Sequence, residues 1–230
     1  MKFKSVTKTY GKQTVLKDFS LDIHGGEILC VLGESGGGKT TLLNLLAGLI
    51  SPDGGKIEEV PERLSYIFQE PRLLPNLSVE KNLLFVGATL ERAEEMLKAT
   101  EIYKQKDKRP EYLSGGEKQR AAIARAFSVD FDLLLMDEPF SSLDTGLKIR
   151  LIETFAKLWK GYLESGKKRT AVFVTHDIEE ALMLADRIAV LKDGKIVFDR
   201  KVERSQTQYP SPYGATTPLR EEILKVLLNG

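Results

Sequence analysis

The chain has 230 residues, of which 42% are apolar and 29% charged, a composition typical of one globular unit and not of a disordered chain. Its 34 Lys and Arg residues nearly cancel its 33 Asp and Glu residues, so no bulk charge attracts nucleic acid or anionic lipid. No segment approaches the ~18 uninterrupted apolar residues of a membrane helix, and the first residues lack the apolar core of a signal peptide. We therefore expect a chain that neither spans a membrane nor is exported. The single cysteine, Cys30, is expected to pack as a small hydrophobe in a reducing compartment.

The first third of the chain has the pattern of strands arranged around a glycine loop. Alternating apolar residues predict antiparallel strands across residues 2–23, joined by a turn at 10–12. A short apolar strand at 27–32 runs into a glycine-rich segment, and an apolar-periodic helix is expected over 40–49. A turn at 52–55 then leads to strands at 56–60 and 64–68. The order of strand, glycine loop and helix is typical of nucleotide binding.

The remainder alternates helices and strands after a helical insertion. Residues 78–108 are helical in pattern. The elements expected beyond them are helices at 115–127 and 147–164, strands at 133–136 and 170–175, a helix ending at Ala185 and a hairpin of 188–191 with 195–198 across Asp193 and Gly194. Asp177 and Glu180 resemble a capping box for the helix that follows them. The pattern predicts an α/β fold with a mostly parallel core sheet, an N-terminal antiparallel β layer and an inserted α-helical subdomain.

The glycine loop carries the most specific local motif. The pattern G-x-x-x-x-G-K-[ST] is matched by Gly33, Glu34, Ser35, Gly36, Gly37, Gly38, Lys39 and Thr40. Its glycines let backbone N–H groups converge on phosphate oxygens at a helix N-terminus. Lys39 is expected to contact the β and γ phosphates, and the Thr40 hydroxyl to bind Mg²⁺. A merely flexible glycine loop is the alternative, and the strand and helix on either side argue against it.

Two acids follow the apolar strand at 133–136. Asp137 and Glu138 stand where an α/β sheet binds ligands, at the carboxyl end of a strand. Asp137 is expected to hold the Mg²⁺ shell and Glu138 to polarise the attacking water. An ordinary strand-to-loop transition would explain the pair equally well if it stood alone, but a phosphate loop in the same chain favours the catalytic interpretation.

A third motif distinguishes between families. Leu113 is followed by Ser114, Gly115, Gly116, Glu117, Lys118, Gln119 and Arg120. Physically this is a second helix start able to bind an anion, or otherwise an ordinary capped helix. The segment closely resembles the signature motif of ATP-binding-cassette (ABC) proteins, whose fold is that of a P-loop NTPase. In that family the motif closes over the γ-phosphate held by another subunit, so the resemblance implies an ATP-dependent homodimer in which Ser114, Gly115, Gly116 and Glu117 act in trans.

The resemblance implies roles for further positions along nearly the whole chain. Tyr10 matches an aromatic residue that stacks on adenine. The alternative is a tyrosine that only forms part of a turn. The predicted nucleotide site also includes Val15 and Thr41. Gln69 matches a glutamine that senses Mg²⁺ or the water and links to the membrane partner, although alone it would be a surface amide. Within the segment Ser141, Ser142, Leu143 and Asp144, the last residue matches one that couples the two sites of the dimer, or is a simple helix cap. His176 matches a histidine that contacts the γ-phosphate, whereas His24 matches nothing and is expected at the surface.

The same resemblance implies how the chain is divided and what it does. We expect one ABC ATPase domain over 1–230. It comprises a RecA-like core with the β subdomain (1–76 and 128–205), a helical subdomain with the signature motif (77–127), and a C-terminal loop and helix (206–230). The segment from Phe68 to Pro75, the pair Leu158 and Trp159, and the residues around His176 look like importer ATPases of the nitrate, sulfonate and taurine group. Asn76 departs from the pattern of that group, which frequently has a tryptophan at this position.

The expected function is ATP hydrolysis, with ATP and Mg²⁺ as cofactors, that powers solute import. The chain would act at the cytoplasmic face of the cell membrane, through separate transmembrane permease subunits and with a solute-binding protein in the full system. One alternative is a soluble ABC ATPase of DNA repair or translation. Those relatives usually carry tandem cassettes, coiled-coil arms or zinc motifs, and the near-neutral charge here lacks a nucleic-acid footprint. A third hypothesis is a regulator that binds nucleotide without hydrolysing it. The presence of Glu138 and His176 argues against this hypothesis.

Overall fold

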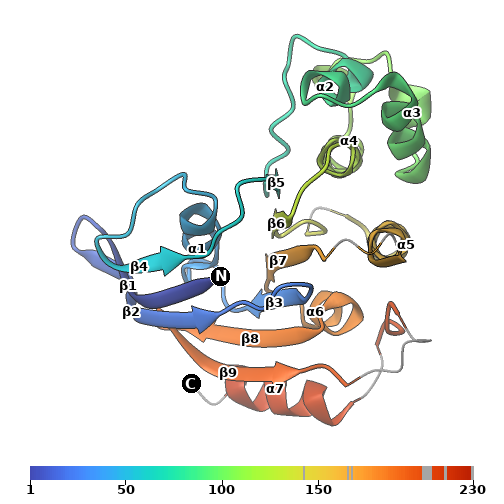
Figure 1. The fold of residues 1–230 in the computed structure, drawn as a ribbon. Coiled ribbons are helices and arrows are strands. Elements are labelled where there is room, and N and C mark those ends of the chain that lie inside the picture. The colour runs from blue at the N-terminus through green and yellow to red at the C-terminus, as the bar shows by residue number, and fades with distance from the viewer. Residues whose placement is uncertain (142, 165, 167, 204–208, 215–216, 229–230) are drawn as a thin grey trace.

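The computed structural model describes residues 1–141, 143–164, 166, 168–203, 209–214 and 217–228. Within these residues the strands form two sheets (Figure 1). The smaller sheet is antiparallel, in the order β2-β1-β4, and comprises β1 (Lys2–Tyr10), β2 (Gln13–Asp22) and β4 (Gly54–Glu58). The larger has the order β5-β6-β7-β3-β8-β9 and comprises β3 (Ile28–Leu32), β5 (Leu64–Ile67), β6 (Leu133–Asp137), β7 (Thr170–Thr175), β8 (Arg187–Lys192) and β9 (Lys195–Lys201).

The strand order of the larger sheet sets the position of the functional loops. Strands β5, β6, β7, β3 and β8 are parallel, and β9 is antiparallel to β8. The strand β7 lies between β6 and β3, so the carboxyl ends of these three strands meet at one edge of the sheet. Loops that are far apart in sequence therefore converge there, as expected for ligand binding in α/β sheets.

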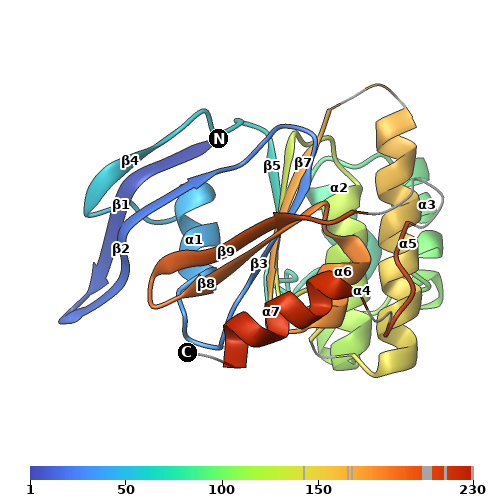
Figure 2. The ribbon, with the colours of Figure 1, turned by 90° about the horizontal axis from the view of Figure 1, so that it is seen from below.

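Alternate residues of the central strands pack on opposite faces of the larger sheet. In β3, Cys30 and Leu32 belong to one apolar core, whereas Leu29 and Val31 belong to the other. Helix α1 (Lys39–Leu46) covers the second face, between the two sheets, and α4 (Gly115–Phe127), α5 (Thr145–Glu164) and α6 (Ile178–Leu184) cover the first (Figure 2). Burial on both faces explains the almost continuous apolar runs of the central strands β3, β6 and β7.

Helices α2 (Val79–Phe85) and α3 (Leu90–Ala99), the 3₁₀ turns Tyr103–Gln105 and Pro110–Tyr112, and α4 form an arm that lies apart from the antiparallel sheet (Figure 1). The predicted helical stretch 78–108 is thus interrupted. Ser78 and Thr89 each accept a hydrogen bond from a backbone N–H in the first turn of their helix, so each begins a separate helix. The subdomain boundaries 77–127 stay a prediction.

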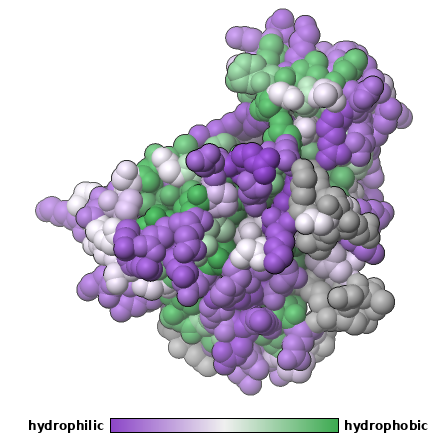
Figure 3. Space-filling view, viewed as in Figure 1, coloured by the Kyte–Doolittle hydropathy of each residue, from purple (hydrophilic) through white to green (hydrophobic). Residues whose placement is uncertain are grey.

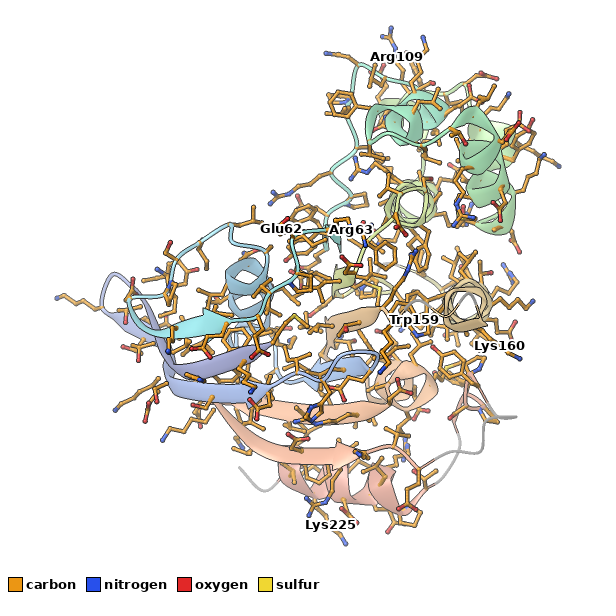
Figure 4. All side chains as sticks on the ribbon, in the orientation of Figure 1. Glu62, Arg63, Arg109, Trp159, Lys160 and Lys225 are labelled. Carbon is orange, nitrogen blue, oxygen red and sulfur yellow. The ribbon has the colours of Figure 1, made fainter. Side chains whose placement is uncertain are left out.

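The long helix α5 lies beside the larger sheet and below the arm in Figure 1. Trp159 is 2% exposed and stacks on Phe155, with ring centroids 5.8 Å apart. Figure 4 shows Trp159 on the side of α5 that faces the sheet and Lys160 on the opposite side. The helix ends at Glu164, as predicted, and Ser165, the next residue, lies outside the described residues. Helix α7 (Pro218–Leu228) packs near β9 and agrees with the C-terminal helix expected from the sequence.

Two local predictions were wrong in detail. The predicted turn at 52–55 partly belongs to β4, which begins at Gly54. Gly55 has φ +73°, and a Cβ there would lie 2.2 Å from the Ser5 carbonyl oxygen, so the close approach of β1 requires glycine. The capping box at Asp177 is only half formed. Asp177 caps α6, but the Glu180 carboxylate accepts from the Thr175 hydroxyl instead of from the Asp177 backbone.

Candidate nucleotide site

The glycine loop connects β3 to α1 and encloses the Lys39 ammonium group. Lys39 is 5% exposed, and its Nζ donates to the carbonyl oxygens of Gly33 and Glu34, both at 2.8 Å. Gly38 has φ +96°, and a Cβ there would lie 2.8 Å from the Val15 side chain of β2. The loop therefore wraps around its own lysine and leaves no space for a larger residue at its last glycine.

A carboxylate, an imidazole and the loop lysine meet where β3, β6 and β7 end. Glu138, directly after β6, is 8% exposed and has φ +44°, a left-handed conformation uncommon for a non-glycine residue. Its Oε1 lies 3.6 Å from Lys39 Nζ, and its Oε2 lies 3.1 Å from Nδ1 of His176, which follows β7. The backbone N–H of Glu138 donates to the Val174 carbonyl at 2.9 Å. These contacts fix one carboxylate between a buried cation and a half-exposed imidazole.

Asp137, the last residue of β6, lies beside Thr40. The aspartate is 3% exposed; burial raises the pKa of its carboxyl group, and the hydrogen bond with Thr40 opposes that rise. Thr40 itself is exposed, at the start of α1. A buried carboxylate and an exposed hydroxyl thus adjoin each other at the mouth of the glycine loop.

A cavity of about 300 Å³ opens over the loop. Its lining residues are Tyr10, Gln13, Val15, Ser35, Gly36, Gly38, Lys39, Thr40, Thr41, Gln69 and Glu138. Asp137 and His176 do not line the cavity. Asp137 contacts the lining residue Thr40, and His176 contacts the lining residue Glu138. Glu34 and Gly37 line a separate hollow of about 230 Å³ on the side of the β8–β9 turn.

Gln13 is the cavity residue that sequence reasoning missed. It pairs with Tyr10 across the β1–β2 turn. Because that turn was predicted, the residue directly opposite Tyr10 could have been proposed from the hairpin register alone. Tyr10 is 48% exposed and lines the cavity.

The signature residues lie outside this cavity. Ser114 and Gly115 are exposed at the start of α4. The Ser114 hydroxyl accepts from the Glu117 N–H at 3.3 Å, and the Glu117 carboxylate accepts from the Ser114 N–H at 2.8 Å, which together form a capping box. The start of α4 is therefore a capped helix start, as the alternative expected, and its residues do not line the cavity that contains Lys39; the binding of an anion there stays a prediction.

Asp144 forms the helix cap that the sequence left as an alternative. Its Oδ1 accepts from the Leu147 N–H at 3.0 Å, at the beginning of α5. The neighbouring Ser142 lies outside the described residues. A role of Asp144 in coupling two sites stays a prediction. His24 is exposed, as expected.

Comparisons with known proteins agree with this geometry. The family model described as "ABC transporter" matches residues 16–141. An aliphatic sulfonates import ATP-binding protein from Granulibacter bethesdensis is 44% identical, over 96% of this chain and 92% of that protein. A carnitine transport ATP-binding protein from Listeria monocytogenes is 40% identical, over 86% of this chain and 54% of that protein. A dimeric ATP-binding cassette in a post-hydrolysis state, bound to ADP and Pi, is 33% identical with a TM-score of 0.76, over 89% of this chain and 99% of that one.

The chain belongs to the ABC transporter family, as an ATP-binding subunit that hydrolyses ATP. The expected fold class is thereby confirmed: a P-loop ATPase with a mostly parallel sheet, an antiparallel β layer and inserted helices. Across the part of the chain that the structure describes, no helix combines the length and apolar character needed to cross a bilayer.

Proposed function

We propose that two copies of this chain close head-to-tail over two ATP molecules and drive an importer. Each ATP would lie between the loop of residues 33–41 in one copy and Ser114, Gly115, Gly116 and Glu117 of the other. The observation that carries this proposal is the exposure of Ser114 outside the cavity that contains Lys39. Each chain would offer two anion-binding helix starts, of which only that of the glycine loop lines the cavity, and a two-fold partner would complete each site.

The residues of the cavity, together with His176 and Asp144 outside it, suggest a division of roles. Tyr10 would stack on the base, and the N–H groups of the glycine loop with Lys39 would hold the phosphates. Glu138 would accept a proton from the attacking water, with His176 and Gln69 positioned to orient the γ-phosphate and the water. Val15 and Thr41 would complete the pocket wall, and Asp144 would couple the two sites.

The residues present fit a magnesium ion. Mg²⁺ prefers hard oxygen donors, and this chain offers the hydroxyl of Thr40, the carboxylate of Asp137 and the amide oxygen of Gln69. The ion commonly keeps several waters and substrate phosphate oxygens as its other ligands. Fittingly, the described residues include no group of three or more His, Cys, Asp and Glu that could cage a metal by themselves. When bound, Mg²⁺ would neutralise charge on the phosphates. Thr40 and Asp137 would orient it, since they already adjoin each other.

Replacement of Thr40 by Val should raise the Mg²⁺ concentration needed for half-maximal ATPase activity, because valine fills a similar volume but offers no oxygen ligand. Thr40→Ser keeps the hydroxyl and is the matched control. Phosphate release would be measured against Mg²⁺ at fixed ATP for both variants. Equal metal titrations for Thr40→Val and Thr40→Ser would contradict the assignment of Thr40 to the metal.

The helical arm would be the docking site for a membrane subunit, and its exposed apolar side chains support that role. Phe85 is 69% exposed, Leu90 54% and Tyr112 69%, and Figure 3 displays hydrophobic surface over α2. The loop after β5 leads from Gln69 of the nucleotide cavity to this arm. Its Arg72 is exposed, stacks over the Phe68 ring at 4.1 Å, and accepts through its carbonyl from Arg125 of α4 at 2.6 Å. This route would connect the state of the nucleotide to a helix of the permease.

Arg72→Glu is therefore expected to impair assembly with the permease while leaving the isolated subunit folded, because the change reverses a charge on an exposed side chain. Arg63→Glu, at an exposed ion pair on the opposite end of the same strand, β5, is the control. Co-purification with the permease and transport by reconstituted vesicles would be measured. Assembly that survives Arg72→Glu together with polar replacements of Phe85 and Leu90 would argue against this surface.

The proposed cargo is a small organic anion of the aliphatic sulfonate class, taken up from a solute-binding protein through the permease. Its support is the relative at 44% identity over nearly the whole chain that is named for aliphatic sulfonates import. Named relatives in transport also favour this function over DNA repair or translation. The chain would then act at the cytoplasmic face of the membrane. Vesicles that hold the complete system should take up an alkanesulfonate when supplied with ATP, and uptake of carnitine but no sulfonate would overturn the proposed cargo.

A further inference from the structure

A lysine that does not line the nucleotide cavity is held between two carboxylates, one on α6 and one at its N-cap. Lys148 lies on α5 with a side chain 14% exposed. Its Nζ is 2.7 Å from Oδ2 of Asp177 and 2.8 Å from Oε1 of Glu180. Glu180 is 1% exposed; burial raises the pKa of its carboxyl group, and the contact with Lys148 and the hydrogen bond from Thr175 oppose that rise. One cation thus lies between two carboxylates, of which Glu180 is buried and Asp177 is partly exposed.

This ion cluster fixes the residues on both sides of His176. The Thr175 hydroxyl donates to Glu180 Oε2 at 2.7 Å and accepts from the Asp177 N–H at 3.0 Å. The Asp177 carboxylate accepts from the backbone N–H of Glu179 at 2.8 Å and contacts Lys148 through its other oxygen. The turn from Thr175 to Asp177 is therefore closed by a ring of polar contacts. His176 projects from this ring toward Glu138, with 3.1 Å between Nδ1 and Oε2.

The same lysine adjoins the segment that precedes α5. The Lys148 N–H donates to the Asp144 carbonyl at 2.8 Å, one helical turn earlier. Asp144 is also the residue whose carboxylate begins that helix. Lys148 thus joins the start of α5 through its backbone and the His176 turn through its side chain. Neither Lys148, Asp177 nor Glu180 lines the nucleotide cavity.

We propose that Lys148 is a positioning residue for ATP hydrolysis, which holds the turn of residues 175–177 so that His176 meets Glu138 and ties that turn to Asp144. The proposal rests on the role proposed above for His176. Without the cation, two close carboxylates would repel each other, and the ring that orients the turn would open. A small displacement of His176 would then lower the rate, while Tyr10, Lys39 and the glycine loop, which line the cavity, stay in place.

Lys148→Met should lower kcat by roughly 10²-fold, the loss that a misplacement of about 1 Å can cause, while the Kd for ATP stays near its wild-type value. Lys148→Arg should restore most of kcat, because arginine can bind both carboxylates. Arg187→Met is the matched control. Arg187 is a cation with a side chain 11% exposed, held between Asp199 and Glu27 at the amino end of β8, away from the nucleotide edge. The Arg187→Met variant should lose about as much thermal stability as Lys148→Met, yet keep the kcat of the wild type.

His176→Ala, assayed in the same way, distinguishes a failure of the role proposed for His176 from a failure of the role proposed for Lys148. Full kcat in His176→Ala would remove the proposed role of that histidine. A low kcat in His176→Ala with a wild-type kcat in Lys148→Met would overturn the inference about Lys148 alone, as would an equal loss in Arg187→Met. If Lys148→Met does not fold, the double variant Lys148→Met with Glu180→Gln removes the excess negative charge. It should fold and still turn over slowly; a wild-type kcat in that variant would overturn the proposal.

Discussion

Replacing Glu138 by Gln is expected to lower ATP turnover by about 10²- to 10⁴-fold, the loss typical when a general base is removed. The amide keeps the shape of the side chain but accepts no proton from the attacking water. ATP should still bind, because Lys39 retains its contacts with the carbonyl oxygens of Gly33 and Glu34. Phosphate release at saturating ATP would measure turnover, and a fluorescent nucleotide analogue would measure affinity.

Asp132→Asn is the control for that variant. Asp132 lies just before β6, at the end of the strand opposite to Glu138, and forms an exposed ion pair with Arg63. An exposed pair of this kind contributes only about 0–1 kcal/mol to stability, so turnover should not change. Turnover in Glu138→Gln within a few-fold of wild type would mean that another group accepts the proton.

Local pattern was enough to predict most elements and the individual motif residues. The apolar run before Asp137 and the glycine loop before Lys39 each predict a strand end, and parallel strands present such ends at one edge. What the sequence did not contain is the strand order. Lys39 and Glu138 meet because β7 alone lies between β3 and β6, an arrangement fixed by packing of the whole sheet.

Contacts made through tertiary structure were the ones missed. Asp177 and Glu180 were interpreted by their spacing as a capping box, since local spacing is all that a single sequence offers. The structure brings Lys148 of α5 to the same place, and Glu180 turns toward it and toward Thr175. Lys148 is 29 positions from Asp177 and further still from Glu180, and a charged residue at such a distance leaves no periodic signal. Such partners follow from the docking of α5 on α6, which the sequence pattern does not specify.

In a Glu138→Gln background, ATP should convert the chain from monomer to dimer, and ADP should not. The γ-phosphate is the group that both copies would hold, so only ATP favours the closed form. ATP that binds the dimer alone at 100 times its Kd would stabilise that form by about 2.7 kcal/mol per site. Light scattering behind a sizing column would report the mass at several protein concentrations.

Adding Ser114→Arg should keep that variant monomeric in ATP. The long side chain would occupy the exposed helix start that has to reach the partner's γ-phosphate. Thr89→Arg is the matched control, because Thr89 is likewise an exposed N-cap in the same helical arm. Both substitutions cost a cap, roughly 1 kcal/mol of local stability, but only the change at Ser114 should abolish the dimer. A dimer that forms equally with both arginine variants would remove Ser114 from the interface. A monomer at high concentration in Glu138→Gln with ATP would contradict the composite site itself.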